Sequence, residues 1–99
     1  MNTQYDTLAR AIAAAQGFIA ETKTPRLPGG QAPDKTSEWL RWHRIVSSRA
    51  DGNRSRLGSN ILQGSPEEVE QARALQAELQ DLAARHAVEA EKFIVRWSL

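Results

Sequence analysis

Residues 64–97, GSPEEVEQARALQAELQDLAARHAVEAEKFIVRW, decide the fold of this chain. Gly64 can end one helix, and Ser65 can cap the amino terminus of the next. Pro66 suits the first helical position, and Glu68 completes a capping box with Ser65. No glycine or proline occurs from Val69 to residue 96, and strong helix formers dominate that stretch. The sequence therefore predicts one long helix over about 66–97.

Apolar positions recur along this predicted helix at the spacing of a single helical face. The stripe from Leu79 to Trp97 advances by eighteen residue steps, or five whole turns, so it can run straight without supercoiling. This spacing favours packing in a bundle over a leucine zipper. The stripe consists of Val69, Ala72, Leu75, Leu79, Leu82, His86, Ala90, Phe93 and Trp97.

The length of the predicted helix argues against a spherical molecule. About 32 helical residues span roughly 48 Å, whereas a compact chain of this size has a radius of gyration of about 13 Å. We therefore expect an all-α, elongated three- to four-helix bundle with a long C-terminal helix, whose apolar stripe is covered by a second copy or another protein. An alternative tucks the apolar end, 93–99, into the chain's own core. The predicted interface residues are Leu79, Leu82, Ala90, Phe93, Ile94 and Trp97.

The amino-terminal third predicts a helix over about 3–22 followed by a loop over 24–35. Thr3 can cap the helix, with Asp6 reaching back to complete a capping box. The loop contains three prolines and a glycine pair, which exclude a regular helix. It is either a mobile spacer or an ordered contact loop. The apolar face of the predicted helix contains Tyr5, Leu8, Ile12, Ala15, Phe18 and Ile19.

The middle of the chain predicts a helix over about 37–50 and a shorter one over about 54–63. Thr36 or Ser37 can cap the first of these. Asp51-Gly52-Asn53 is typical of a turn or helix stop, so we expect the chain either to kink or to break there, with a β-hairpin as the alternative. At helical spacing the side chains expected to point inward are Trp39, Trp42, His43, Val46 and Ala50, opposite Arg41, Arg44 and Ser48.

Charge is unevenly distributed, although the chain of 99 residues carries a net charge of only +1. The basic segment 41–56 holds five arginines and a single acid, Asp51. Guanidinium groups match phosphate geometry, so one hypothesis is binding of a nucleic acid, a nucleotide or another phosphorylated ligand. The others are a solvated face that pairs with the acidic last helix, or an acidic protein partner. The arginines are Arg41, Arg44, Arg49, Arg54 and Arg56.

Composition and motifs indicate no catalytic, metal or cofactor site. The chain has no cysteine, no apolar run long enough for a membrane span and no secretory signal, so we expect one domain in the cytoplasm. His43 and His86 both fall on apolar stripes, which is typical of hydrogen-bonded core histidines, and they could meet if their helices pack together. No nucleophile, Walker or dinucleotide-binding motif occurs.

These observations favour a non-enzymatic interaction module over an enzyme. We expect a small self-associating helical adaptor, assembly component or stoichiometric inhibitor of another macromolecule. Its partners would be another copy of itself and another protein. The alternative is binding of nucleic acid or a phosphorylated ligand through the arginines of 41–56. In its short, alanine-rich, helical character the chain resembles small accessory proteins of bacteria and their phages.

Overall fold

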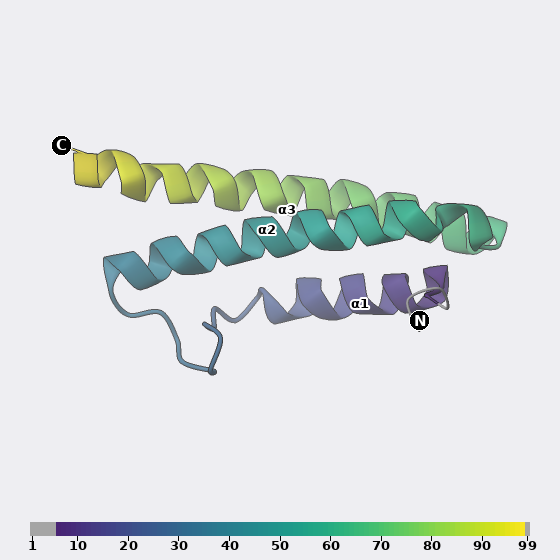
Figure 1. Ribbon diagram of the computed structural model, residues 1–99, viewed down its shortest axis with the longest axis horizontal. Coiled ribbons are helices and arrows are strands. Elements are labelled where there is room, and N and C mark those ends of the chain that lie inside the picture. The colour runs from purple at the N-terminus through teal and green to yellow at the C-terminus, as the bar shows by residue number, and fades with distance from the viewer. Residues whose placement is uncertain (1–5, 99) are drawn as a thin grey trace.

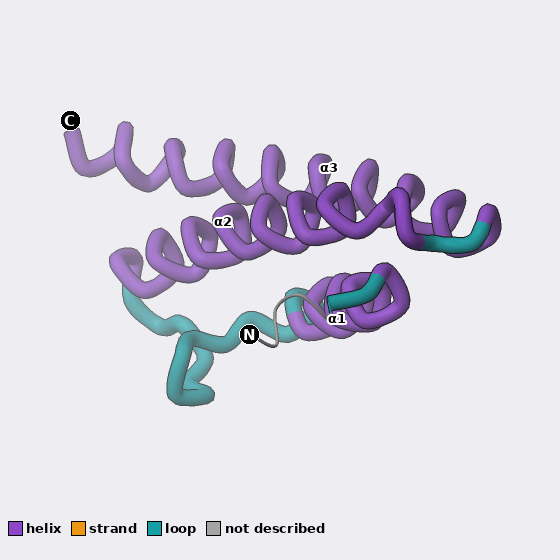
Figure 2. Tube along the Cα trace, turned by 45° about the vertical axis from the view of Figure 1, so that its right-hand side comes forward, coloured by secondary structure: helices purple, strands orange, loops and turns teal. Residues whose placement is uncertain are grey.

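The computed structural model describes residues 6–98, and the side chains of residues 6–94. In this part of the chain all regular structure is helical, and the molecule is elongated, with extents of 50 × 24 × 24 Å and a radius of gyration of 15.4 Å. The two longest helices run antiparallel beside each other, and the first helix of the chain lies against one half of the pair (Figure 1; Figure 2). The elements are α1 (Leu8–Glu21), α2 (Thr36–Asn60), the short 3-10 helix η2 (Ile61–Gln63) and α3 (Pro66–Ser98).

The start of α3 confirms the predicted capping box. The Glu68 backbone N–H donates to Ser65 Oγ at 3.2 Å, and the Glu68 carboxylate accepts the Ser65 backbone N–H at 2.9 Å. Gly64 has an ordinary negative φ of −91°. A Cβ atom at Gly64 would collide with the buried side chain of Leu8. The structure therefore needs glycine here for close approach to α1, and not for a left-handed turn.

The predicted break at Asp51-Gly52-Asn53 is wrong, because α2 runs without interruption from Thr36 to Asn60. The separate helices over 37–50 and 54–63 are therefore one element, and the β-hairpin alternative is wrong as well. Ala50 and Leu57, one on each side of Gly52, are fully buried on the same face of α2. Each stop signal costs a helix about 1 kcal/mol or less. Burial of the apolar face on both sides outweighs that cost.

The start of α1 differs from the prediction. Thr7 is the cap, since its Oγ1 accepts the Arg10 backbone N–H at 3.2 Å. Thr3 and Tyr5 lie outside the described residues. The Asp6 carboxylate does not complete a capping box; it accepts hydrogen bonds from Arg56 and Asn60 on α2, because a guanidinium gives it a stronger partner.

The segment between α1 and α2 contacts the rest of the molecule through buried side chains. Leu27 and Pro33 are buried, and a tight turn closes where Gly30 N–H donates to the Leu27 carbonyl at 2.8 Å. Gly29 and Gly30 both adopt positive φ, which side-chain-bearing residues rarely do. At the end of the loop, neither Thr36 nor Ser37 caps α2. Instead the Glu38 carboxylate accepts the backbone N–H groups of Asp34 and Lys35, at 2.8 and 3.2 Å.

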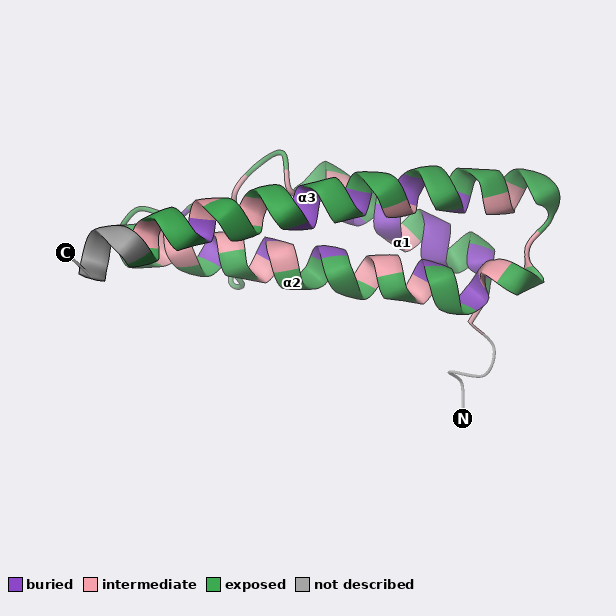
Figure 3. Cartoon of the chain, turned by 90° about the horizontal axis from the view of Figure 1, so that it is seen from above, coloured by how far each residue is buried: buried purple, intermediate pink, exposed green. Residues whose placement is uncertain are grey.

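The core divides the molecule into two unlike halves. Leu8, Ile12 and Phe18 of α1 pack against α2 and α3 where all three helices lie together. Past the end of α1 at Glu21, α2 and α3 continue as a pair (Figure 3), and the segment that follows α1 packs beside them, with Leu27 buried in the same core cluster as Trp42. We call this part, residues 36–47 and 83–94, the distal half. The hydrogen bond from Ser47 Oγ to the Ala83 carbonyl, at 3.0 Å, joins its two helices.

Candidate functional site

The residues predicted to form an interface divide into buried and exposed groups. Leu79, Leu82 and Ala90 are buried inside the single chain. The sequence argument placed them at an interface because the apolar stripe of the long last helix was expected to protrude from the chain's own globule, whereas α2 runs beside α3 and covers them. Phe93 is half-buried, with its ring 5.9 Å from that of His43. Ile94 is 39% exposed, and the side chain of Trp97 lies outside those described.

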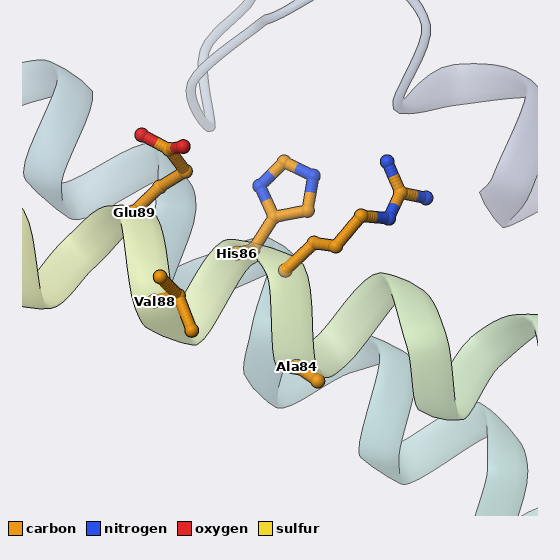
Figure 4. A pocket seen from close by; sticks show the side chains of 5 residues that line it. Ala84, His86, Val88 and Glu89 are labelled. Atoms are coloured by element: carbon orange, nitrogen blue, oxygen red, sulfur yellow. The ribbon is translucent and has the colours of Figure 1, made fainter.

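A second apolar strip on α3 faces solvent, and the sequence analysis missed it. Val88 is 53% exposed and lies beside a hollow that His86 and Glu89 also line. Figure 4 shows His86 and Glu89 projecting from one side of α3, with Val88 and Ala84 further round the helix. The sequence signal that could have revealed this strip is the recurrence of apolar residues at steps of three and four on the side of α3 away from the core stripe. We call this strip the outer seam; it consists of Ala84, Ala87 and Val88.

The two histidines meet across the distal half. His43 Nδ1 of α2 and His86 Nδ1 of α3 are 2.8 Å apart, which confirms that the pair meets when the helices pack. Two nitrogens at this distance form a hydrogen bond only if one carries a hydrogen and the other offers a lone pair. Trp42 packs edge-on against His86, with ring centroids 4.9 Å apart. Contacts with the neighbouring rings of Trp42 and Phe93 therefore hold both imidazole rings in place.

Burial lowers the pKa of both imidazoles. Burial is the main cause of the lowered pKa of His43. For His86, the charges on His43 and Arg85 lower the pKa further. Glu89 acts in the opposite direction and raises the pKa of both rings. The neutral form of each histidine is thus favoured relative to an exposed imidazole.

The five arginines of the basic segment do not act together. The Arg56 guanidinium binds both Asp6 oxygens, at 2.9 and 2.6 Å, and this hydrogen-bonded pairing lowers the pKa of Asp6 to about 2. Arg54 lies 3.6 Å from Asp51 on its own helix. Among the residues with described side chains, none of these arginines pairs with a carboxylate of α3. The predicted pairing with the acidic last helix is therefore wrong for this part of the chain.

The other three arginines lie along the outward side of α2. Arg41, Arg44 and Arg49 are exposed, and within residues 6–94 no carboxylate oxygen lies within 4.0 Å of their nitrogens. They line a shallow groove together with two aliphatic and two hydroxyl side chains, and we call it the arginine groove. Its remaining residues are Ser37, Leu40, Ile45 and Ser48.

Two further features, a metal-binding cluster and a membrane-spanning helix, do not occur in the described part of the chain. Within it, no three histidine, cysteine, aspartate or glutamate side chains are grouped so that they could hold a metal ion. None of its helices combines the length and hydrophobicity that crossing a membrane requires. No protein-family model, curated protein or solved structure matches this chain.

Proposed function

We propose that this chain is a non-enzymatic interaction module that self-associates through the distal half of its bundle. The observation that carries the proposal is the exposure of Val88 on the outer seam. A branched aliphatic side chain that is 53% exposed leaves apolar surface in water, and docking against a second copy would remove it. Ala84 and Ala87, which precede Val88 on α3, are exposed and small and would let a second helix approach closely.

The distal half also offers a suitable frame for docking. α2 holds α3 from one side, and a second copy that docks its own outer seam against this one would bury both Val88 side chains between two α3 helices. The buried stripe of α3 is already covered by α2, so the outer seam replaces Leu79, Leu82 and Ala90 in the interface proposed. Phe93 and Ile94 remain at its edge.

Replacement of Val88 with aspartate tests this proposal through the mass of the protein in solution. We expect the full chain at neutral pH to sediment as a multiple of its 11.0 kDa mass, and the Val88→Asp variant to sediment as one chain. A carboxylate buried at the interface would lose its hydration without a partner. Analytical ultracentrifugation over a range of concentrations measures both.

Leu62→Asp is the matched control for that experiment. Leu62 is 97% exposed and lies in η2, at the opposite end of the molecule from the distal half (Figure 1). The Leu62→Asp variant makes the same kind of apolar-to-acidic change without touching the proposed surface. Its mass in solution should therefore equal that of the unaltered chain. A monomeric unaltered chain, or a Val88→Asp variant that keeps the full mass, would contradict the proposal.

The arginine groove supports a second candidate function, which is binding of a nucleic acid or another phosphorylated ligand. The specific observation is that three exposed guanidinium groups, with no described carboxylate oxygen within 4.0 Å of their nitrogens, share one groove with hydroxyl side chains. Arg54 and Arg56 do not belong to this candidate site because each has an acidic partner. Trp42 is buried, so bases would not stack on it.

A salt titration with matched double variants tests this second candidate. Arg41→Ala with Arg44→Ala should weaken binding of a fluorescent single-stranded oligonucleotide about tenfold or more, and it should flatten the salt dependence. Arg73→Ala with Arg85→Ala removes the same charge from α3 and should change affinity little. Fluorescence anisotropy from about 0.05 to 0.5 M salt measures the difference. Equal losses in both double variants would point to net charge alone and contradict a site in the groove.

A further inference from the structure

We propose that the contact between His43 and His86 is a proton-sensitive latch that keeps the distal half closed and competent to self-associate. This inference rests on the proposed function, because it concerns control of that same surface. It adds a definite consequence, which is that mild acidification dissociates the assembly.

The geometry of the contact limits how many protons it can hold. A neutral pair places one hydrogen between the two Nδ1 atoms, which are 2.8 Å apart. If one ring becomes protonated, the shared hydrogen bond can persist, since the other ring still offers a lone pair. If both are protonated, two N–H groups of two cations face each other. The rings must then separate.

Separation of the rings would act directly on the docking surface. His86 lines the hollow beside Val88, and the ring of His43 lies 5.9 Å from that of Phe93. Along the chain the next hydrogen bond between the two helices is the one from Ser47 to Ala83, and Trp42 and Ala83 belong to the same buried core. Parting of α2 from α3 there would remove packing that holds this part of α3 in place, and this part of α3 carries the outer seam.

The charged groups around the pair do not remove its sensitivity to protons. Glu89 and Arg85 face the pair from α3, but Glu89 is bound by Lys92 at 3.2 Å and Arg85 by Asp81 at 2.9 Å. From the end of α1, Lys23 shares a hollow with His86, together with Glu78 of α3. From α2, no charged group contributes to the pKa shift of either ring except His43 itself.

The direction of the pH dependence follows from the lowered pKa values. In the closed state both imidazoles have pKa values below the ordinary 6.5, so an opened state binds protons more readily. The contribution of the latch is therefore complete above about pH 6.5 and is lost as the pH falls below that value. The chain has only two histidines, and the paired Asp6 stays ionised down to about pH 2, so this window reports on the latch.

Nitrogen NMR of the full chain tests the latch without any variant. At about pH 7.5 we expect one imidazole in the Nδ1–H tautomer and the other in the Nε2–H tautomer, because the shared hydrogen requires unlike rings. Two rings with the same Nε2–H tautomer and an ordinary titration would overturn the inference. Since these spectra do not depend on self-association, they judge the latch even if the proposed function fails.

Sedimentation as a function of pH tests the consequence for assembly. We expect the dissociation constant of the unaltered chain to rise about tenfold or more from about pH 7.5 to 5.5, in line with a tenfold change for each unit of pKa difference. His86→Gln keeps a hydrogen-bonding group opposite His43 but does not titrate, so its pH dependence should fall severalfold. The circular dichroism of this variant at pH 7.5 confirms that it is folded.

The possible results of these experiments distinguish the histidine latch from the proposed self-association. A chain that is monomeric at pH 7.5 refutes self-association. An oligomer whose mass does not respond to pH refutes the latch and leaves the proposed function standing. An equal pH response in the unaltered chain and in folded His86→Gln also refutes the latch.

Discussion

Replacement of Leu79 with alanine is expected to lower the free energy of unfolding by about 3–5 kcal/mol. The Leu79 side chain is fully buried, and it belongs to the core cluster to which all three helices contribute. Alanine removes three carbons and leaves a cavity that close-packed neighbours cannot fill completely. Urea denaturation followed by circular dichroism measures the change.

Val88→Ala is the control for the core variant. Val88 lies on the same helix but is 53% exposed, so its truncation should change stability by about 0.5 kcal/mol or less. The comparison is made at a protein concentration where both variants are monomeric. A similar loss in both variants would mean that Leu79 is not a core residue, and it would return that residue to the interface that the sequence predicted.

Replacement of Gly52 with proline is expected to destabilise the chain by about 3 kcal/mol or more. Residue 52 lies inside α2, where its backbone N–H is part of the helical ladder and a proline ring would clash with the carbonyl four residues earlier. Gly52→Ala should instead raise stability by about 0.5–1 kcal/mol, because a Cβ there meets no atom within 4 Å and alanine is the better helix former. Thermal and urea unfolding measure both changes.

The two variants at Gly52 decide between two descriptions of the chain. If Asp51-Gly52-Asn53 formed a turn, proline would be tolerated and alanine would cost stability. Opposite signs for the two substitutions, in the order expected above, require a continuous helix.

Prediction from the sequence succeeded best for α3. Ser65, Pro66 and Glu68 form a strong start signal, and an unbroken run of helix formers follows, so local chemistry and burial favour the same structure. The inward side of α2 was also predictable, since Trp42, Val46 and Ala50 are all buried. Periodicity is a strong signal where one side of a helix is uniformly apolar.

Prediction failed where local signals and packing disagree. Asp51, Gly52 and Asn53 each weaken a helix by a small amount, and burial of Ala50 and Leu57 on both sides outweighs them. Asp6 could equally well cap its own helix or bind a distant cation, and nothing near it in the sequence reveals that Arg56, fifty residues later, is its partner.

The candidate site was predicted only in part. The sequence placed His43 and His86 on apolar faces, and it identified the apolar carboxy-terminal part of α3. It did not separate the apolar residues that the chain buries from those that it leaves exposed, because both recur at helical spacing. The five arginines also seemed equivalent until Asp6 and Asp51 engaged two of them.

The amino-acid sequence by itself determined that this chain is helical, which side of each helix is apolar and where α3 begins, because these depend on contacts between residues a few positions apart. Only the tertiary structure decided that α2 is continuous, that Asp6 binds Arg56, that the histidines touch and that Val88 remains in water. Each of those results depends on residues far apart in the chain, whose separation in space no local propensity encodes.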